Sequence, residues 1–566
     1  MRHILALLAL LSLPVTINAQ SSSAGKFRPD DPLRVEPLPL PVTSAQVRKV
    51  SDVYDLFLNT FASPAEPQPK AGPPIPARGV NTLGEVSDPS WYVNRHYFQP
   101  MTVEELVRGP GNETPPAAGS WTVVAAKNEG ITPGFTIRDS TGQLYVMKFD
   151  PMSNPEIASA ADVITSKILY ALGYHVPENY IVHFERSRLA IGEEAQLVDR
   201  TGHKRKMSDQ DLADILFKVP RDAQKNYRAI ASRYLVGKPV GPRRYHGTRR
   251  DDPNDTVPHE HRRDLRGLRV FCAWVNHDDS RAINSLDMVV NEGGIPFIRH
   301  YLVDFGSTLG SASNGPNSPR SGIEELFSWT SSAKEFFTLG LWVPRWARAR
   351  YPNLPSVGRF EYEAFDAERW TPEYHNPAFS NMLPDDEFWA ARQVMAFTDD
   401  QIRALVRTGE FSDTRAEEWI TKCLIERRNK IGRVFLSKVL PLDRFAVQGA
   451  TLVFQDLTPT HELLELSQRV QSASGTNGGS GLTRRYRAHW AEFDNSTGAH
   501  TPIRGEGLTI PSTSAAYILA TISAEDPKKS VRVYLRRQSG GWEVVGVERT
   551  WSRDCNKRMS SIIPTS

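Results

Sequence analysis

Alternation of apolar and polar residues predicts a small antiparallel sheet starting near residue 120. Three short segments have strand character, and turns rich in Gly, Pro, Asp and Ser separate them. We therefore expect a three-stranded meander, with Gly130 and Gly134 in its first turn and Lys148 in its third strand. The expected strands are residues 121–126, 135–138 and 145–149.

A change to helical spacing follows the meander. Apolar residues recur every three or four positions, which is typical of one face of a helix. Asn154 is expected to cap this helix, Pro155 to occupy its first turn and Gly173 to end it after Leu172. Two acids on the helix, Glu156 and Asp162, are candidates to pair with Lys148. The apolar face consists of Ala158, Ala161, Ile164, Ile168 and Leu172.

The remaining pattern predicts an α+β protein with two lobes and a further β-domain. A break rich in Gly and Pro at 237–242 separates a sheet-forming part from a helical part, as a hinge would. Beyond residue 442 short strands dominate, which favours a separate β-sandwich-like domain. Strands are expected at 180–184, 228–236, 298–303, 451–454, 483–493, 514–522, 530–537 and 542–550. Helices are expected at 209–217, 262–275, 399–407 and 414–436.

The N-terminus predicts export. A basic start, an apolar run over residues 4–13 and small residues before Gln20 are typical of a signal peptide, here residues 1–19. Residues 20–90 are rich in Pro, Ser and Ala, which favours an extended tether interrupted by one short helix at 44–61. No later apolar stretch is long enough for a transmembrane helix. We therefore expect a periplasmic or extracellular protein.

Composition narrows the possible partners. A net charge of +3 in 566 residues gives no reason to expect binding to nucleic acid or to an anionic membrane. Three widely spaced cysteines, Cys272, Cys423 and Cys555, do not form the framework of a disulfide-rich fold. The triplet at 259–261, His-Glu-His, places its two imidazoles two residues apart, where they do not share a helix face. We do not expect a metal site there.

The candidate catalytic and metal-binding residues lie in two segments that follow one another along the chain. His277-Asp278-Asp279 begins a loop in which Asn284 stands five residues after Asp279, and Asp304-Phe305-Gly306 ends the next apolar strand. Carboxylate and amide oxygens suit Mg²⁺ or Mn²⁺. Phosphoryl transfer needs an acid facing the nucleophile and oxygen ligands for a metal that bridges phosphates. The order and spacing of these residues therefore indicate a phosphotransferase.

Residues 121–310, about a third of the chain, resemble the atypical branch of the protein-kinase-like superfamily. The segment 302–310, LVDFGSTLG, looks like the metal-binding strand of phosphoinositide kinases. The segment 171–178, ALGYHVPE, is similar to the end of the first-lobe helix in HipA-type bacterial kinases. The resemblance implies that residues 91–236 form an N-lobe that contains an insertion and that residues 237–442 form a helical C-lobe. A C-terminal β-domain would then span residues 443–566.

The same resemblance implies a role for each candidate residue. Lys148 would contact the phosphates of ATP, held by Asp162 or Glu156, beneath a turn containing Gly130 and Gly134. Asp279 would be the catalytic carboxylate, with Asn284 and Asp304 as metal ligands. The neighbouring Asp278 could take the place of Asp279. No segment resembling Ala-Pro-Glu follows Asp304, so the sequence does not indicate a conventional protein-substrate platform.

Three functions are compatible with these residues. The first is a secreted, metal-dependent phosphotransferase that uses ATP or a related nucleotide and a protein, sugar or small-molecule acceptor. The second is a catalytically silent kinase-fold scaffold, and the third is a nucleotidyl transferase that uses the same residues. Loss of a phosphate or metal ligand would favour the scaffold, and the sequence shows no such loss.

Overall fold

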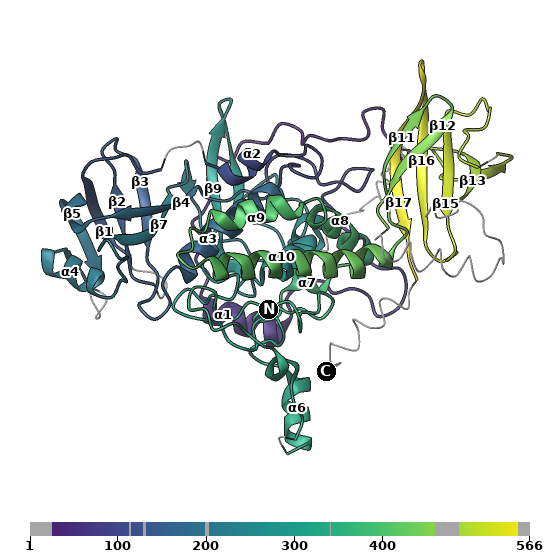
Figure 1. The fold of residues 1–566 in the computed structure, drawn as a ribbon. Coiled ribbons are helices and arrows are strands. Elements are labelled where there is room, and N and C mark those ends of the chain that lie inside the picture. The colour runs from purple at the N-terminus through teal and green to yellow at the C-terminus, as the bar shows by residue number, and fades with distance from the viewer. Residues whose placement is uncertain are drawn as a thin grey trace, which may run out of the picture.

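A computed structural model describes residues 25–111, 115–127, 132–198, 203–339, 341–458, 486–505 and 507–552. The predictions for the signal peptide, Gly130 and Cys555 lie outside these ranges. The described chain has an α+β fold, with a sheet-rich lobe at one end, helices in the middle and a second β-rich part at the other end (Figure 1).

The first lobe is built on a seven-stranded sheet with the order β4-β7-β3-β2-β1-β5-β6. The predicted meander is confirmed, because β1, β2 and β3 pair antiparallel in sequence order. Two strands were not predicted: β5 pairs parallel with β1, and β6 extends the edge. The strands are β1 Trp121–Ala126, β2 Gly134–Arg138, β3 Leu144–Lys148, β4 Asn179–Phe184, β5 Leu189–Val198, β6 Lys204–Lys206 and β7 Tyr227–Arg233, with helix α4 Asp209–Phe217 inserted before β7.

Helix α3, Ile157–Ala171, lies against this sheet and is almost entirely buried. Its predicted cap was wrong. Asn154 donates through Nδ2 to the carbonyl of Pro355, and the carboxylate of Asp150 accepts from the backbone amides of Ala158 and Ser159 at 2.8 Å. Asp150 follows Phe149, just beyond the end of β3, so the first turn of the helix is hydrogen-bonded to the segment that leaves the strand carrying Lys148.

The second lobe combines a hairpin with a bundle of helices. Strands β9 and β10 pair antiparallel, and β8 adds a short third strand. Buried apolar residues of α3, α5, α8, α9 and α10 form one continuous core. The elements are β8 Lys238–Pro239, α5 Arg263–Val275, β9 Ser285–Glu292, β10 Ile295–Leu302, α6 Trp329–Phe337, α7 Pro377–Ser380, α8 Pro384–Val394, α9 Asp399–Arg407 and α10 Thr414–Phe435.

The C-terminal part contains a two-stranded hairpin and a five-stranded sheet, ordered β14-β13-β15-β16-β17. One apolar cluster includes Leu442 and Leu452 of the hairpin together with Val531 and Val533 of the sheet. Strands β11 and β14 were not predicted. The strands are β11 Leu442–Gln448, β12 Thr451–Asp456, β13 Arg487–Phe493, β14 His500–Ile503, β15 Tyr517–Ser523, β16 Ser530–Gln538 and β17 Gly541–Thr550.

The expected free tether is instead anchored along its length. Phe27 is buried among the aromatic rings of the C-terminal sheet, and Val42 joins a small core with Val240 and Ile298. The expected helix at 44–61 is shorter, with α1 at Asp52–Phe57 and a π-helical turn at Leu58–Ala62. A further helix, α2, spans Val103–Arg108. Proline-rich composition predicted the extended backbone but not the contacts that hold it.

Two predicted absences can be examined in the described residues. None of their helices combines the length and the hydropathy needed to cross a bilayer. Cys272 and Cys423 are both buried free thiols.

Candidate active site

Lys148, at the end of β3, lies between two carboxylates from different parts of the chain. Its Nζ donates to Asp162 Oδ2 at 3.0 Å and to Asp304 Oδ1 at 2.8 Å. Asp162 comes from α3, and Asp304 follows β10. The contact joins the first lobe to the second at a charged centre, across 156 positions of sequence.

The two carboxylates differ in burial and in the direction of their pKa shifts. Burial raises the pKa of Asp162, and Lys148 partly offsets that rise. Asp304 has a side chain that is 47% exposed, and Lys148 lowers its pKa. Burial opposes the charge on Lys148, but the two acids outweigh it and raise the pKa of the amine. The site therefore holds a permanent cation between a structural acid and an accessible one.

Hairpin register places Asn284 beside the segment that carries Asp304. Strand β9 begins at Ser285 and pairs there with Leu302, so residues 284 and 303 meet at the open end of the hairpin. The Val303 amide donates to the Asn284 carbonyl at 3.0 Å. Asn284 Nδ2 donates to the Asp279 carbonyl at 2.7 Å, which joins this end to the Asp279 loop.

The backbone at Asp304 is strained. Its φ is 62°, a left-handed conformation that L-residues other than Asn and Asp seldom adopt. Phe305, the next residue, is fully buried in the core that α3 and α5 share. Burial of Phe305 holds the turn in place, and the turn directs the Asp304 carboxylate toward Lys148. Strain of this kind, at about 1–3 kcal/mol, is commonly retained at functional sites.

Asp279 lies in an ionic cluster around Arg281. Arg281 binds the Asp279 carboxylate through Nε, Asp52 at 2.7 Å through Nη1 and Glu373 at 3.3 Å through Nη2. These acids outweigh burial and raise the pKa of Arg281. Burial raises the pKa of the neighbouring Asp278 to about 7, the charges of Asp279 and Glu373 raise it further, and a hydrogen bond from Ser321 lowers it in part. Both acids are partly buried.

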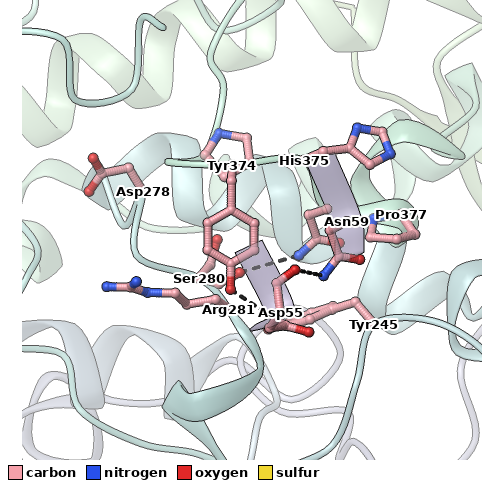
Figure 2. Close-up of a pocket in the computed structure, with 11 residues that line it drawn as sticks. Asp55, Asn59, Tyr245, Asp278, Ser280, Arg281, Tyr374, His375 and Pro377 are labelled. Carbon is pink, nitrogen blue, oxygen red and sulfur yellow. Dashed lines mark hydrogen bonds between the residues drawn. The ribbon is translucent and has the colours of Figure 1, made fainter. Parts of the chain in front are cut away.

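A small cavity borders this cluster. It has a volume of about 10 Å³, enough for one water molecule, and its lining includes Asp55, Ser280, Arg281 and Tyr374. Figure 2 shows the Tyr374 hydroxyl directed at Asp55, to which it donates at 2.8 Å. The cavity is thus closed on one side by α1, from the anchored N-terminal segment.

The other predicted site residues are the two glycines of the first turn and Glu156. Gly134 pairs with Lys148 in the sheet, and a Cβ there would lie 2.2 Å from the Met147 carbonyl, so the position requires glycine. Gly130 lies outside the described residues. Glu156 does not contact Lys148. Its carboxylate accepts from the Ser412 amide at 3.0 Å, so of the two candidate partners Asp162 is the one that binds the lysine.

Three further residues support the site and were not singled out from the sequence. Asn179 donates to Asp162 Oδ1 at 2.8 Å, which fixes the buried carboxylate. Lys127, beside the first turn, lowers the pKa of Asp304. Arg281 holds Asp279, as described above. A lysine next to a glycine-containing turn was a usable signal, whereas the contacts of Asn179 and Arg281 depend on the fold.

Asp304 and Asn284 fit a divalent cation that binds together with a phosphorylated substrate. Within the ranges that the structure describes, no group of three or more His, Cys, Asp or Glu side chains could hold a metal. Mg²⁺ is usually held by one or two protein carboxylates plus substrate phosphates, so a full protein cage is not required. Asp304 supplies an accessible carboxylate, and Asn284 an amide whose nitrogen already has a partner.

No protein-family model and no curated protein matches the chain. Several solved structures with partial similarity are kinases. The Helicobacter pylori proinflammatory kinase CtkA is 11% identical, covers 54% of this chain and 95% of its own, and has a TM-score of 0.29. The Golgi casein kinase with Mn/ADP bound is 8% identical, covers 60% and 77%, and has a TM-score of 0.26.

A third structure is the Rio2 kinase from Chaetomium thermophilum in an ADP/Mg²⁺-phosphoaspartate complex. It is 11% identical, covers 52% of this chain and 72% of its own, and has a TM-score of 0.19. TM-scores of this size do not establish a shared fold. The functional assignment therefore rests on the geometry around Lys148.

Proposed function

We propose that this chain is an exported, metal-dependent phosphotransferase with a kinase-like catalytic domain. It would move a phosphoryl group from ATP or a related nucleotide to a hydroxyl group of a protein, sugar or small molecule. The observation that carries the proposal is the position of Lys148, which bridges buried Asp162 and accessible Asp304 beside the Asn284 loop. Export rests on the sequence of residues 1–19.

Each residue of the site has a distinct task in such a reaction. Asp162 and Asn179 hold Lys148, whose fixed positive charge would stabilise phosphate oxygens as negative charge redistributes. Asp304 and Asn284 would hold Mg²⁺ or Mn²⁺, which screens the charge of the phosphates when bound. Asp279 would orient the acceptor hydroxyl and accept its proton, and Arg281 fixes the direction of that carboxylate.

The exposure of Asp304 supports this proposal over a purely structural one. An acid that only stabilised the interface between lobes would not need a side chain about half exposed to solvent. Buried Asp162 already provides a counter-charge for Lys148. The second acid, which is accessible to solvent beside the lysine, is better explained by a ligand.

Transfer of labelled phosphate tests the proposal. The purified mature protein would be incubated with Mn²⁺ or Mg²⁺, an extract as a source of acceptors, and ATP labelled at either the α- or the γ-phosphate. We expect incorporation of the γ-label alone. Asp279→Asn should lose it, while Asp209→Asn on α4, whose side chain is 89% exposed, should retain it.

Two results would change the assignment. Incorporation of the α-label would indicate nucleotidyl transfer by the same residues. No incorporation of either label, together with no binding of any nucleotide, would leave the silent scaffold.

A further inference from the structure

Helix α1 and the turn after it bury their polar face and expose their apolar face, the reverse of an ordinary surface helix. Their polar side chains face the protein: Asp52 binds Arg281, Asp55 accepts from Tyr374, and Asn59 is buried. Their large apolar side chains face solvent. The outward set, each more than half exposed, is Val53, Tyr54, Phe57 and Phe61. A soluble helix normally buries its apolar face, so this arrangement indicates that something covers the exposed one.

A second apolar surface lies on the projection that carries α6. Figure 1 shows α6 extending away from the body of the second lobe, on the side where α1 lies. Residues 336–343 contain no charged side chain. Exposed fractions reach 81% for Phe337 and 90% for Leu339. The exposed apolar residues here are Leu326, Phe336, Phe337, Leu339, Leu341 and Val343.

Aromatic contacts join the two surfaces into one. The rings of Phe57 and Phe61 lie 5.7 Å apart, and Phe61 lies 5.4 Å from Phe327 at the base of the projection. The combined surface consists of α1, the π-helical turn after it and the described residues 326–339 and 341–343, and it has ten large apolar side chains that are more than half exposed. Single exposed apolar side chains are normal on a monomer, whereas a set on adjoining elements marks an interaction surface.

The backbone of the projection is already hydrogen-bonded within itself. The amides of Thr338, Leu339 and Leu341 donate to carbonyls three or four residues earlier, and the Trp342 amide donates to Thr338 Oγ1 at 3.2 Å. A segment that enters hydrocarbon must satisfy its polar backbone internally, because no water is present there. These four amides have partners inside the projection, which lowers the cost of moving this part of the backbone out of water.

Basic residues surround the apolar tip. Residues 334–350 contain one acidic and four basic residues, a net charge of +3. Arg348 and Arg350 are exposed, and Trp346 lies in the same short segment. Tryptophan beside arginine at the edge of an apolar surface is typical of segments that lie at a membrane–water interface. Clustered basic side chains add attraction to anionic headgroups.

We propose that α1, the turn after it and residues 326–339 and 341–350 form a docking surface for an anionic lipid bilayer. The apolar side chains enter the headgroup region, and the arginines bind phosphate groups. A second copy of the chain fits less well, because a protruding convex tip needs a matching hollow and its basic rim would face another basic rim. The inference does not depend on the proposed phosphotransferase activity. If both hold, Asp52 and Arg281 link the bilayer-facing helix to the Asp279 loop, which favours acceptors at the membrane surface.

Vesicle sedimentation tests this proposal with the mature chain in the absence of nucleotide and metal. We expect the protein to pellet with vesicles of phosphatidylglycerol and phosphatidylcholine but weakly with phosphatidylcholine alone. The double variant Phe336→Ser/Phe337→Ser should weaken binding at least about tenfold, as should Arg348→Glu/Arg350→Glu. Phe217→Ser on α4, where the ring is 86% exposed and far from this surface in the chain, is the matched control.

The outcomes separate the possible occupants. All substituted residues are exposed, so unchanged melting temperatures would show that the variants are folded. The proposal is overturned if the protein does not bind anionic vesicles, or if both double variants bind as tightly as the parent. A concentration-dependent dimer that the phenylalanine variant abolishes, without vesicle binding, would assign the surface to a second copy.

Discussion

Replacement of Lys148 by methionine tests the charged centre of the site. Methionine keeps most of the side-chain volume and removes the cation. Asp162 then stays buried with Asn179 as its remaining side-chain partner, and Asp304 loses the amine that lowers its pKa. We expect the variant to be less stable, because a buried carboxylate without a counter-charge is costly.

The magnitude follows from the burial of the two acids. Breaking a fully buried ion pair by removing one partner costs about 3–5 kcal/mol. Asp162 is 2% exposed and falls in that range, but Lys148 is 16% exposed and Asp304 can turn to solvent. We therefore expect the free energy of unfolding to fall by about 2–4 kcal/mol near neutral pH.

The loss should depend on pH with a definite sign. Burial raises the folded-state pKa of Asp162, so its contribution to stability is present below the unfolded pKa and is lost as pH rises through the folded value. Lys148 limits the rise in the pKa of Asp162. Without the lysine that pKa rises further, and more stability is lost as the pH increases. The deficit of Lys148→Met should therefore be smaller at about pH 4 than at about pH 8.

Urea denaturation followed by tryptophan fluorescence at several pH values measures both effects. Lys206→Met, at an exposed position on β6 of the same sheet, serves as the control. A deficit below about 1 kcal/mol, or one that grows toward acid pH, would refute the reasoning about Asp162.

Three other substitutions test the start of α3, the buried acid next to Asp279 and the anchor of the N-terminal segment. Asp150→Ala removes the cap of α3 and should cost about 2–3 kcal/mol in urea denaturation; a cost below about 0.5 kcal/mol would contradict the role of Asp150 as the cap. Asp278 has a pKa raised to about 7 by burial, so its contribution to stability is lost as pH rises through that value. Asp278→Asn should flatten the stability profile from about pH 6 to pH 8, and an unchanged slope would argue against this shift. Phe27→Ala should release the anchored N-terminal segment, at a local cost of about 3–4 kcal/mol, and limited proteolysis should then cut within residues 28–50. Resistance equal to that of the parent would show that the other contacts hold the segment without Phe27.

Local chemistry made several elements predictable. The helices at Asp209–Phe217 and Asp399–Arg407 have the bounds that the sequence indicates. Each begins after a hydroxyl residue whose side chain accepts from the third helical amide, in a reciprocal capping box. The meander was predictable for a similar reason, since short turns join neighbouring strands and the pairing needs no distant partner.

Elements that depend on distant contacts were missed. Strand β5 pairs parallel with β1 across an interval that contains α3 and β4, and strand propensity does not reveal such a partner. Helix α3 is capped by Asp150, because the chain bends after β3 and brings that carboxylate under the first helical turn. Asn154 was expected to be the cap because it lies just before the helix in sequence. The bend of the chain instead brings the Asp150 carboxylate to the first helical amides.

In the candidate site, too, local sequence identified the residues, whereas their pairing depends on distant contacts. Spacing in the sequence singled out Asp279, Asn284 and Asp304. The place of Lys148 in the third strand, together with the resemblance to kinase-like folds, singled out the lysine and left two carboxylates as its partners. Choosing Asp162 over Glu156 required the direction in which α3 presents its faces to the sheet. The ion pair between Asp52 and Arg281 joins residues 229 positions apart, so no local pattern could have indicated it.

The most direct test of the account is metal-dependent nucleotide binding at Asp304. Melting temperatures of the mature protein would be compared with and without ATP and Mn²⁺ or Mg²⁺, beside Asp304→Ala. Ligand at a hundred times its dissociation constant should stabilise the folded protein by about 2.7 kcal/mol. We predict a shift that needs both nucleotide and metal and that is lost in the variant. No shift with any nucleotide, or an equal shift in the variant, would contradict a nucleotide site built around Lys148 and Asp304.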